Sequence, residues 1–571
     1  MKFRFSLTVF GLALAARAQI PDLGPNVTIF SPATPRAEMQ QKIDEIYALQ
    51  RHSEFGTGRH AFLFLPGDYH LNLPIGFYTE VAGLGTTPDA THLSGDIYAE
   101  PASRDDNATT TFWRSMENIS VTPIDGILEW AVSQAAPVRR LHVLGALTLH
   151  VHQGWASGGW ISDTLVDGAV DAGPQQQWIS RNAEWKGWTG SNWNMVFVGV
   201  PQAPAGNWPH PTFTRVDRTP LELEKPYLVA DDAEHWRIVV PALKKDTTGT
   251  SWGHGSQPEA RSIPFSEVYV ASPIRDTAAT LNAQLAAGKN LLLTPGTYEL
   301  TESLRVTRPN TVVLGLGFAT LRPTRGTAAI ETADADSIDL AGLLIDAGEE
   351  RSSVLVQVGP PGSNANHGDR PIALHDVFFR VGGANVGRAD ENLEINSRET
   401  IVDHTWIWRA DHGKGVGWTQ NLSNTGLLVN GDDVTIYGLF VEHHQRFQVQ
   451  WNGERGRTYF YQSEIPYDPP TQAAYTSAPG TEGWAAYKVA DTVKQHEAWG
   501  LGVYSVFTYP DVFVTHAFEV PRTPGVRFHD MVTVCLLTNG GFRHIIDEVG
   551  APTKCGPGRI DPKLTEFPET K

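Results

Sequence analysis

The stretch Asp433–Pro470, DVTIYGLFVEHHQRFQVQWNGERGRTYFYQSEIPYDPP, is the part of the chain from which we predict the fold. Its two runs of strand-forming residues, Val434–Val441 and Thr458–Tyr461, each lead to a glutamate, Glu442 and Glu464. The two glutamates are 22 residues apart, which is roughly the length that one turn of a parallel β-coil needs. Neighbouring strands in such a stack lie about 4.8 Å apart. We therefore expect both carboxylates on one face, one above the other.

Three short motifs that contain proline or glycine occur in the first half of the chain and recur in the same order in the second half. They are called landmarks here. The offsets between matching landmarks are 241, 229 and 232 residues. Apolar residues at helical spacing also predict a helix after the first landmark of each half, over residues 36–50 and 277–287. We interpret this pattern as an internal duplication. The matching landmarks are Ser31-Pro32 with Ser272-Pro273, Pro66-Gly67 with Pro295-Gly296, and Gly83-Leu84-Gly85 with Gly315-Leu316-Gly317.

The strand-like runs of both halves are short and separated by turns. No series of long helices alternates with strands, which argues against a doubly wound α/β fold. We expect an all-β protein built from two tandem right-handed parallel β-helices, with the duplicated halves packed around a shared cleft; an array of β-sandwiches is the alternative. The expected divisions are a signal peptide at 1–18, a first β-helix at 19–200, a structured connector at 201–264, and a second β-helix with a C-terminal cap at 265–571.

The N-terminus predicts export. Lys2 and Arg4 precede an apolar run over residues 5–16, and Ala16-Arg17-Ala18 offers the small residues of a signal-peptide cleavage site. No later segment has the roughly 18 apolar residues of a membrane helix. The mature protein should be secreted and extracellular. In a eukaryotic host, sequons at Asn26, Asn107, Asn118 and Asn421 would be glycosylation acceptors.

Composition narrows the range of partners. A formal net charge of −18 argues against nucleic acid, anionic membranes and polyanionic substrates, because an acidic surface repels them. The 17 tryptophans suit a neutral polysaccharide, since their faces stack on sugar rings. We expect a monomer without cofactor or metal. In an oxidising compartment, the only two cysteines, Cys535 and Cys555, should form a disulfide rather than remain free thiols.

The paired glutamates have the chemistry of a glycosidase. Hydrolysis of a glycosidic bond needs a protonated carboxyl near the leaving oxygen and a means of positioning water opposite it. Two like charges held about 5 Å apart cannot both ionise cheaply, so one of Glu442 and Glu464 should stay protonated near neutral pH. Solvated turn carboxylates are the alternative interpretation. The residues that we expect to contact the substrate are Trp451, Tyr461, Tyr467, Asp411, Gln462 and Trp408.

Two motifs resemble those of a known family. Gln462-x-Glu464-x-Pro466-Tyr467-x-x-Pro470 resembles the segment of the catalytic acid in glycoside hydrolase family 55. In the first half, Ser157-Gly-Gly-Trp-Ile-Ser-Asp163 followed by Gln176-Gln177-Trp178-x-x-Arg181-Asn182 resembles a second signature of that family. The resemblance implies a secreted, mostly exo-acting β-1,3-glucanase with two pectin-lyase-like β-helices. It also implies that Glu464 is the general acid, that Glu442 assists the water, that Gln176 or Gln177 reaches across from the first half, and that the anomeric configuration is inverted.

Two other functions are compatible with a β-helix. A polysaccharide lyase should have a basic cleft and often calcium-binding carboxylates, whereas the expected site here is acidic. A non-catalytic carbohydrate-binding or wall protein would have the same coils, but its glutamates would be replaceable. The loss or retention of activity in a Glu464 variant separates these functions.

Overall fold

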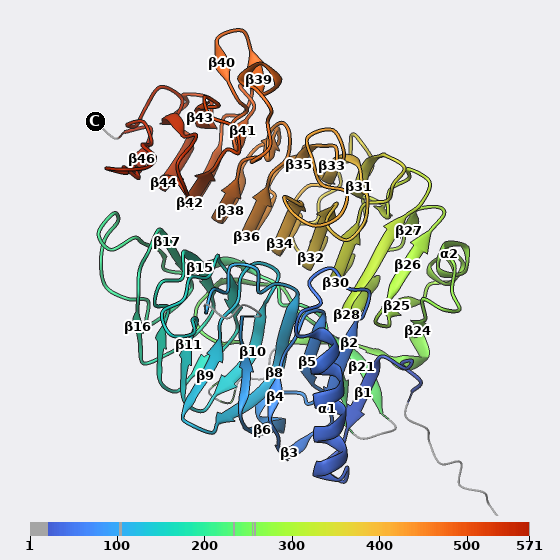
Figure 1. The fold of residues 1–571 in the computed structure, drawn as a ribbon. Coiled ribbons are helices and arrows are strands. Elements are labelled where there is room, and N and C mark those ends of the chain that lie inside the picture. The colour runs from blue at the N-terminus through green and yellow to red at the C-terminus, as the bar shows by residue number, and fades with distance from the viewer. Residues whose placement is uncertain (1–20, 102–105, 232–234, 254, 256–258, 570–571) are drawn as a thin grey trace, which may run out of the picture.

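Two stacks of parallel strands follow one another along the chain and lie side by side (Figure 1). The computed structural model describes residues 21–101, 106–231, 235–253, 255 and 259–569, so the expected signal peptide lies outside it. Within those residues, no helix has the length and apolarity of a membrane span. Early strands of the two stacks are in contact, β2 with β28, and so are later strands, β17 with β42. The stacks therefore lie alongside each other near both of their ends.

The first stack consists of a 12-stranded sheet and a 6-stranded sheet, and every strand pair in both sheets is parallel. The larger sheet contains β1 (Val27–Phe30), β2 (His60–Phe64), β3 (Gly67–His70), β5 (Thr79–Gly83), β6 (Thr91–Gly95), β8 (Arg114–Pro123), β10 (Val138–Val143), β12 (Trp160–Ser162), β13 (Leu165–Val166), β15 (Gln177–Arg181), β17 (Asn194–Val198) and β18 (Phe213–Val216). The smaller sheet contains β4 (Leu73–Pro74), β7 (Ile97–Ala99), β9 (Ile127–Trp130), β11 (Ala146–Thr148), β14 (Ala169–Asp171) and β16 (Gly187–Thr189). Because β18 belongs to the larger sheet, the first stack continues past the expected boundary at residue 200.

The second stack consists of a 12-stranded and a 9-stranded sheet, and along most of it the chain alternates between the two. The larger sheet contains β24 (Val268–Ala271), β25 (Asn290–Leu293), β26 (Thr297–Leu300), β28 (Val312–Pro323), β30 (Asp339–Asp346), β32 (Ala373–Val381), β34 (Ile401–Arg409), β36 (Thr435–Glu442), β38 (Gly456–Glu464), β42 (His496–Ser505), β44 (Val526–Cys535) and the antiparallel β46 (Lys563–Phe567). The smaller sheet contains β27 (Leu304–Val306), β29 (Ile330–Thr332), β31 (Ser352–Val358), β33 (Ala389–Ile395), β35 (Ser423–Val429), β37 (Val449–Trp451), β41 (Tyr487–Val489), β43 (Val514–Glu519) and β45 (Phe542–Ile546).

Antiparallel strands between and beside the stacks complete the fold. The segment that joins the stacks forms two small sheets, and a hairpin extends from the second stack (Figure 1). The joining strands are β19 (Thr219–Glu222), β20 (Tyr227–Ala230), β21 (Trp236–Pro241), β22 (Lys244–Thr247) and β23 (Ala260–Pro264), and the hairpin is formed by β39 (Thr476–Ala478) and β40 (Thr481–Glu482).

The starts of the two stacks repeat one structure, which supports the duplication. In both, a strand is followed by a helix, α1 (Arg36–Gln50) or α2 (Ala278–Ala286), and then by the next strand of the larger sheet. The helix predictions are confirmed, with Thr277 as the N-cap of α2. Tyr69 donates its hydroxyl hydrogen bond to the carbonyl oxygens of residues 30 and 65, and Tyr298 does the same with those of residues 271 and 294.

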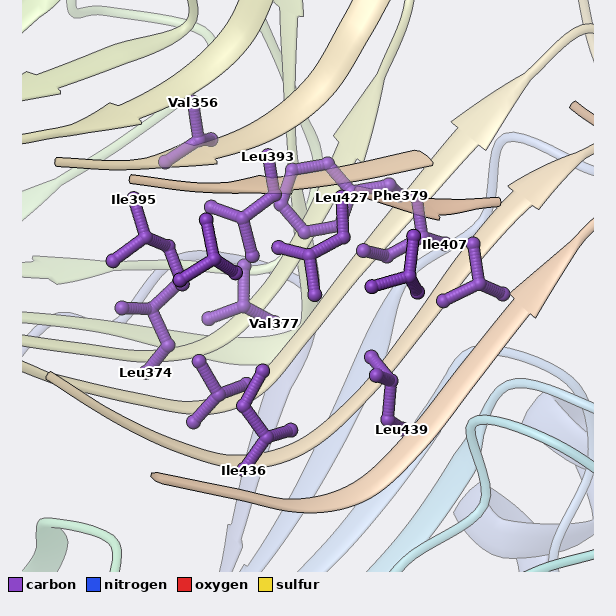
Figure 2. Close-up of a cluster of buried hydrophobic side chains, with 14 of the residues drawn as sticks. Val356, Leu374, Val377, Phe379, Leu393, Ile395, Ile407, Leu427, Ile436 and Leu439 are labelled. Atoms are coloured by element: carbon purple, nitrogen blue, oxygen red, sulfur yellow. The ribbon is translucent and has the colours of Figure 1, made fainter. Parts of the chain in front are cut away.

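The core of each stack lies between its two sheets. Apolar side chains from successive strands stack above one another there (Figure 2). Burying each such side chain contributes roughly 1.5–3 kcal/mol, so long ladders of them stabilise the coils. The labelled part of the second core contains Val356, Leu374, Val377, Phe379, Leu393, Ile395, Ile407, Leu427, Ile436 and Leu439.

In each larger sheet, one residue in or directly after each of several successive strands departs from the β conformation. These residues have left-handed backbone angles and occupy one matching position on successive strands, so they form a continuous row, here called the bend row. The bend row of the second stack contains Gly342, Asp376, His404, Gly438, Phe460, Gly500 and Asp530. That of the first stack contains Asn118, Arg140, Asp163, Asn182 and Gly199.

The two stacks are joined by aromatic side chains and by a buried ion network. Arg139 of the first stack binds Asp376 at 2.8 Å and Asp403 at 2.7 Å in the second. Arg181 binds the same Asp403 at 2.9 Å and Glu224 of the connector at 2.8 Å. All these side chains are at most 3% exposed, so each charge depends on its partners. The aromatic cluster at the interface includes Tyr78, Trp113, Trp160, Phe318, Phe378, Trp406, Tyr437, Phe440, Tyr459 and Phe460.

Two further expectations concern single residues. The disulfide between Cys535 and Cys555 is confirmed. Of the four sequon asparagines, Asn118 and Asn421 are buried, and each donates hydrogen bonds from its side-chain nitrogen to two backbone carbonyls. These two side chains are therefore structural parts of the folded chain, which corrects their assignment as glycosylation acceptors.

Candidate active site

A cavity of about 640 Å³ opens between the two stacks, large enough for several sugar rings. Its described lining comes from both halves of the chain. The first half contributes Asn107, Thr109, Thr110, Phe112, Gln134, Trp155, Ser157, Gln176 and Trp193, and the second contributes Trp406, Trp408, Asp411, His412, Glu442, His443, Glu464, Tyr467, Val506, Leu536, Leu537 and Arg559. The expected shared cleft therefore corresponds to a cavity that neither half encloses alone.

Glu442 and Glu464 lie next to each other at this cavity. They are the last residues of β36 and β38, and the two strands pair in a register that sets Glu442 directly against Glu464. Both side chains line the cavity, as the spacing of the glutamates predicts. The register extends to Trp408 on β34 and Tyr504 on β42, so the glutamates are flanked by aromatic residues on both sides.

Glu442 is held by two hydrogen bonds, one from each half of the molecule. Trp406 Nε1 donates to Glu442 Oε2 at 2.8 Å, and Gln134 Nε2 donates to Glu442 Oε1 at 2.9 Å. Gln134 lies in the loop between β9 and β10, 308 residues away in sequence. The same amide also contacts the Ser157 hydroxyl at 3.4 Å. Neither the role of Gln134 nor that of Trp406 was predicted, because no sequence motif links these residues to Glu442.

The two carboxyl groups share one low-solvent environment and affect each other. Burial raises the pKa of Glu442 to about 7, against the lowering effect of the hydrogen bonds from Trp406, Gln462 and Gln134. Burial also raises the pKa of Glu464 well above its usual range, and the nearby charges of Glu442 and Asp411 raise it further. Of the two carboxyl groups, Glu464 is therefore the one whose protonated form is favoured more strongly near neutral pH.

Asp411 and His412 form a charged pair beside the glutamates. His412 Nδ1 lies 2.9 Å from Asp411 Oδ1, and both side chains line the cavity. Desolvation by the cavity walls raises the pKa of Asp411, but the hydrogen bond with His412 and the charges of His443 and His412 outweigh that effect and lower it to about 2. Asp411 is thus a fixed carboxylate at neutral pH.

The structure separates the roles of Gln176 and Gln177. Gln176 lines the cavity, whereas Gln177 begins β15 and is buried behind it. Gln177 Nε2 contacts the Ser157 hydroxyl at 3.3 Å, so a chain of polar groups runs from Gln177 through Ser157 and Gln134 to Glu442. Ser157 belongs to the first-half motif, but no role at the cavity was predicted for it.

Of the expected substrate contacts, Trp408, Tyr467 and Asp411 lie at the cavity. Trp408 stacks on Trp406, with ring centres 4.7 Å apart, and Tyr467 packs edge-on against His443 at 4.4 Å. The exposed Trp155 and its stacking neighbour Trp193 also line the cavity, from the first half. The sequence offers no signal that separates these two from the buried tryptophans.

The other three expected contacts need correction. Trp451 and Tyr461 point into the apolar core of the second stack, and both are 0% exposed. Tyr461 donates its hydroxyl to the carbonyl of residue 486, and Trp451 fills the space beside Gly456. Gln462 is also fully buried and does not line the cavity; its Nε2 lies 3.4 Å from Glu464 Oε1. It can orient the glutamate but cannot form a sugar platform.

Comparison with known proteins places this site in a family. A family model described as the LAM55 pectate lyase-like domain matches residues 268–464, from the start of β24 to Glu464 at the end of β38. The exo-beta-1,3-glucanase of Streptomyces sp. (strain SirexAA-E / ActE) is 46% identical over 550 residues, which cover 96% of this chain and 90% of that protein.

Two solved structures share the same 46% sequence identity with this chain. The structure of sacteLam55A from Streptomyces sp. SirexAA-E has a TM-score of 0.93 at 46% identity and covers 96% of this chain and 100% of that one. A glutamate-to-alanine variant of sacteLam55A in complex with glucose has a TM-score of 0.94 at 46% identity and covers 96% of this chain and 99% of that one. Because relatives this similar span nearly the whole chain, and the LAM55 model matches its second half, the chain belongs to glycoside hydrolase family 55.

Proposed function

We propose that this protein is an exo-acting β-1,3-glucanase that hydrolyses β-1,3-glucan in the cavity between its two stacks. The observation that carries the proposal is the pair Glu442 and Glu464, in register on adjacent strands of one cavity built by both halves. The name of the Streptomyces relative and the glucose in the variant structure support a glucan as the substrate. Tryptophan faces at the cavity suit the stacking of neutral sugar rings.

Glu464 acts as the general acid. As the bond between the anomeric carbon and the glycosidic oxygen breaks, its electron pair goes to that oxygen, which takes the proton of Glu464. A water molecule attacks the anomeric carbon from the opposite face and inverts the configuration. Glu442, whose pKa lies at about 7, assists this water as its base, and the proton reaches it through a further water molecule because Glu442 lies beside Glu464. Gln134 and Trp406 hold Glu442, and Gln176 at the cavity and Gln177 through Ser157 support the water.

We further propose that the enzyme is a secreted monomer built from two right-handed β-helices. Each stack is a right-handed β-helix of the pectin-lyase-like type, and the alternation of the chain between two parallel sheets supports this. The protein acts outside the cell after removal of residues 1–18, and it works as a monomer because one chain provides both walls of the cavity.

The test is digestion of laminarin, other neutral glucans and uronans by the wild type and by Glu464→Gln. We expect glucose as the product from laminarin, detected by chromatography and reducing-sugar assay, and a loss of at least about 100-fold in the variant. Glu482→Gln, on the remote hairpin strand β40, is the matched control and should keep full activity.

Each alternative function predicts a different outcome of this digestion experiment. Unsaturated products that absorb in the ultraviolet would indicate a polysaccharide lyase. Binding to insoluble glucan without any product, unchanged in Glu464→Gln, would indicate a carbohydrate-binding protein. A ladder of oligosaccharides in place of glucose would contradict exo action, and full activity of Glu464→Gln would remove Glu464 from the mechanism.

A further inference from the structure

The loop after α1 in the first half reaches the cavity wall of the second half. There, His412 Nε2 lies 2.7 Å from Glu54 Oε1, while His412 Nδ1 lies 2.9 Å from Asp411 Oδ1. One imidazole thus bridges two carboxylates that come from opposite halves, and Glu54 is 358 residues from His412 in sequence. Glu54 itself does not line the cavity, so it can affect a bound sugar only through His412 and Asp411.

Packing fixes the position of this loop. Phe55 stacks on Trp408 with an interplanar angle of 11° and meets His412 edge-on at 5.4 Å. The Phe55 ring sits tightly over Gly383 and Gly413, where an added Cβ would lie 2.6 Å and 2.9 Å from it. The hydroxyl of Tyr78 also donates to the backbone carbonyl of Glu54 at 2.5 Å. Glu54 is therefore held in place by groups other than its own carboxylate.

The charges of the bridge are stable near neutral pH. Desolvation lowers the pKa of His412, but the hydrogen bonds with Asp411 and Glu54 and their negative charges outweigh it and raise the pKa to about 10. Besides His412, Asp411 is surrounded by three other titratable groups, namely His443, Glu442 and Glu464. Burial lowers the pKa of His443, so its positive charge is lost at lower pH than that of His412. The imidazolium of His412 is therefore the main positive partner that holds the Asp411 carboxylate.

We propose that Glu54 is a positioning residue of the active site, which acts through His412 to fix the Asp411 carboxylate at the cavity for a hydroxyl of the bound sugar. The proposal rests on the proposed function for the nature of the ligand. A carboxylate that accepts a hydroxyl hydrogen bond is a strong acceptor only when its own position is fixed. Glu54 fixes it from the first half of the molecule, so the loop couples sugar binding to the packing of the two stacks.

Glu54→Gln tests this role because it keeps the size of the side chain and removes its charge. With one carboxylate partner left, His412 loses its proton at lower pH than in the wild type. Glucose binding is followed by tryptophan fluorescence from about pH 5 to about pH 9, because Trp406 and Trp408 line the cavity. At each pH, the glucose dissociation constant of the variant is divided by that of the wild type. Glu442 and Glu464 titrate in both proteins, so their effect on binding cancels in this ratio.

We expect that ratio to be within about twofold at the acidic end and to rise to about five- to tenfold at the alkaline end. Below the lowered His412 pKa of the variant, both proteins carry the imidazolium; between that pKa and the wild-type pKa, only the wild type carries it. Glu45→Gln on α1, where Glu45 is exposed and far from His412, is the matched control and should give a ratio near one throughout. A ratio that is raised equally at every pH, or that stays at one, would overturn the proposal.

A second measurement separates this inference from the proposed function. In protein labelled at histidine, the His412 resonances should report an imidazolium at about pH 8 in the wild type and a neutral ring in Glu54→Gln. Wild type that hydrolyses laminarin while His412 titrates identically in both proteins would refute the role of Glu54 alone. Wild type that neither binds glucose nor cleaves laminarin would refute the function, whatever the His412 resonances show.

Discussion

At the scale of single residues, Glu442 and Glu464 differ in their hydrogen-bond donors although they sit side by side. Glu442 accepts bonds of 2.8 and 2.9 Å from Trp406 and Gln134, and these donors favour its ionised form. Among the described residues, the hydrogen-bond contact of Glu464 is one of 3.4 Å with Gln462, so no comparable donor in that part of the chain stabilises its carboxylate. The difference in donors gives two chemically identical side chains different protonation, which is what an acid and a base on one bond require.

The first prediction concerns Glu442→Gln. Removing the neighbouring charge should lower the pKa of Glu464, although burial still keeps it above the usual range. A general acid works only while protonated, so activity is lost as pH rises through that pKa. The alkaline limb of kcat/KM should therefore move to lower pH, together with a loss of roughly 100-fold or more in kcat. An unmoved alkaline limb would show that Glu442 does not set the protonation of Glu464.

At the scale of elements, the bend row fixes how the strands of the second stack meet the first. Gly438 of β36 has φ of +63°, where a glycine avoids the steric cost of a side chain. The ring of Trp160, from the first stack, lies against this glycine, and an added Cβ would be 2.6 Å from it. Four residues further along the same strand is Glu442. The close approach of the two stacks and the position of Glu442 therefore depend on the same short strand.

Gly438→Ala should be costly for both stability and activity. The left-handed backbone alone costs the alanine about 1 kcal/mol, and the Trp160 ring must also move. We expect a loss of about 2–4 kcal/mol in denaturant unfolding and a clear fall in kcat as Glu442 shifts. The matched control is Gly480→Ala, with φ of +85° and no atom within 4 Å of the added Cβ, which should cost about 1 kcal/mol and no activity. Equal effects of the two substitutions would show that contact with Trp160 is unimportant.

The sequence predicts the strands of this site better than it predicts the direction of their side chains. Spacing and strand propensity placed Glu442 and Glu464 on adjacent strands, and the register confirms it. The same reasoning misplaced Tyr461, because Phe460 has a left-handed φ of +69° and the alternation of faces is interrupted there. An unusual φ at a phenylalanine has no local sequence signal, since it is imposed by stacking on the neighbouring strands.

Contacts between the halves were beyond prediction for a different reason. Gln134 and Glu54 reach the site across 308 and 358 residues, and only the packing of the two stacks brings them there. The duplication indicates that two similar halves exist, but not which of their faces meet. The family motif did identify Gln176 and Gln177 as candidate first-half residues of the site, and the structure places Gln176 at the cavity and Gln177 behind it.

At the scale of the whole molecule, the buried ion network holds the two halves of the cavity together. Asp403 binds Arg139 and Arg181 of the first stack and lies on β34, the strand that also carries Trp406 and Trp408. Burial alone would raise the pKa of Asp403, but the charges of Arg181 and Arg139 hold it far below its usual range. The ionised network therefore persists over the whole range of pH in which the protein can work.

Asp403→Asn should cost about 3–5 kcal/mol, because it leaves buried arginine charge uncompensated. A lowered folded-state pKa stabilises the protein above the unfolded pKa of about 3.9 and less so as pH falls below it. The difference between wild type and variant in urea unfolding should therefore be constant near neutral pH and shrink below about pH 4. Asp433→Asn, which breaks the exposed pair with Arg455, should cost less than about 1 kcal/mol. Equal costs would mean that the network does not hold the stacks together.

The bend row also changes which face the side chains point to along β36 and β38, the strands that carry Glu442 and Glu464. Tyr437 faces the first stack, and in an unbroken strand a residue five positions later would face the opposite way, into the core. Because Gly438 interrupts the alternation, Leu439 and Val441 face the core instead, and Glu442 emerges into the cavity. Phe460 has the same effect between Tyr459 and Glu464. A straight version of these strands would turn Leu439 and Val441 out of the core and would bury both carboxylates.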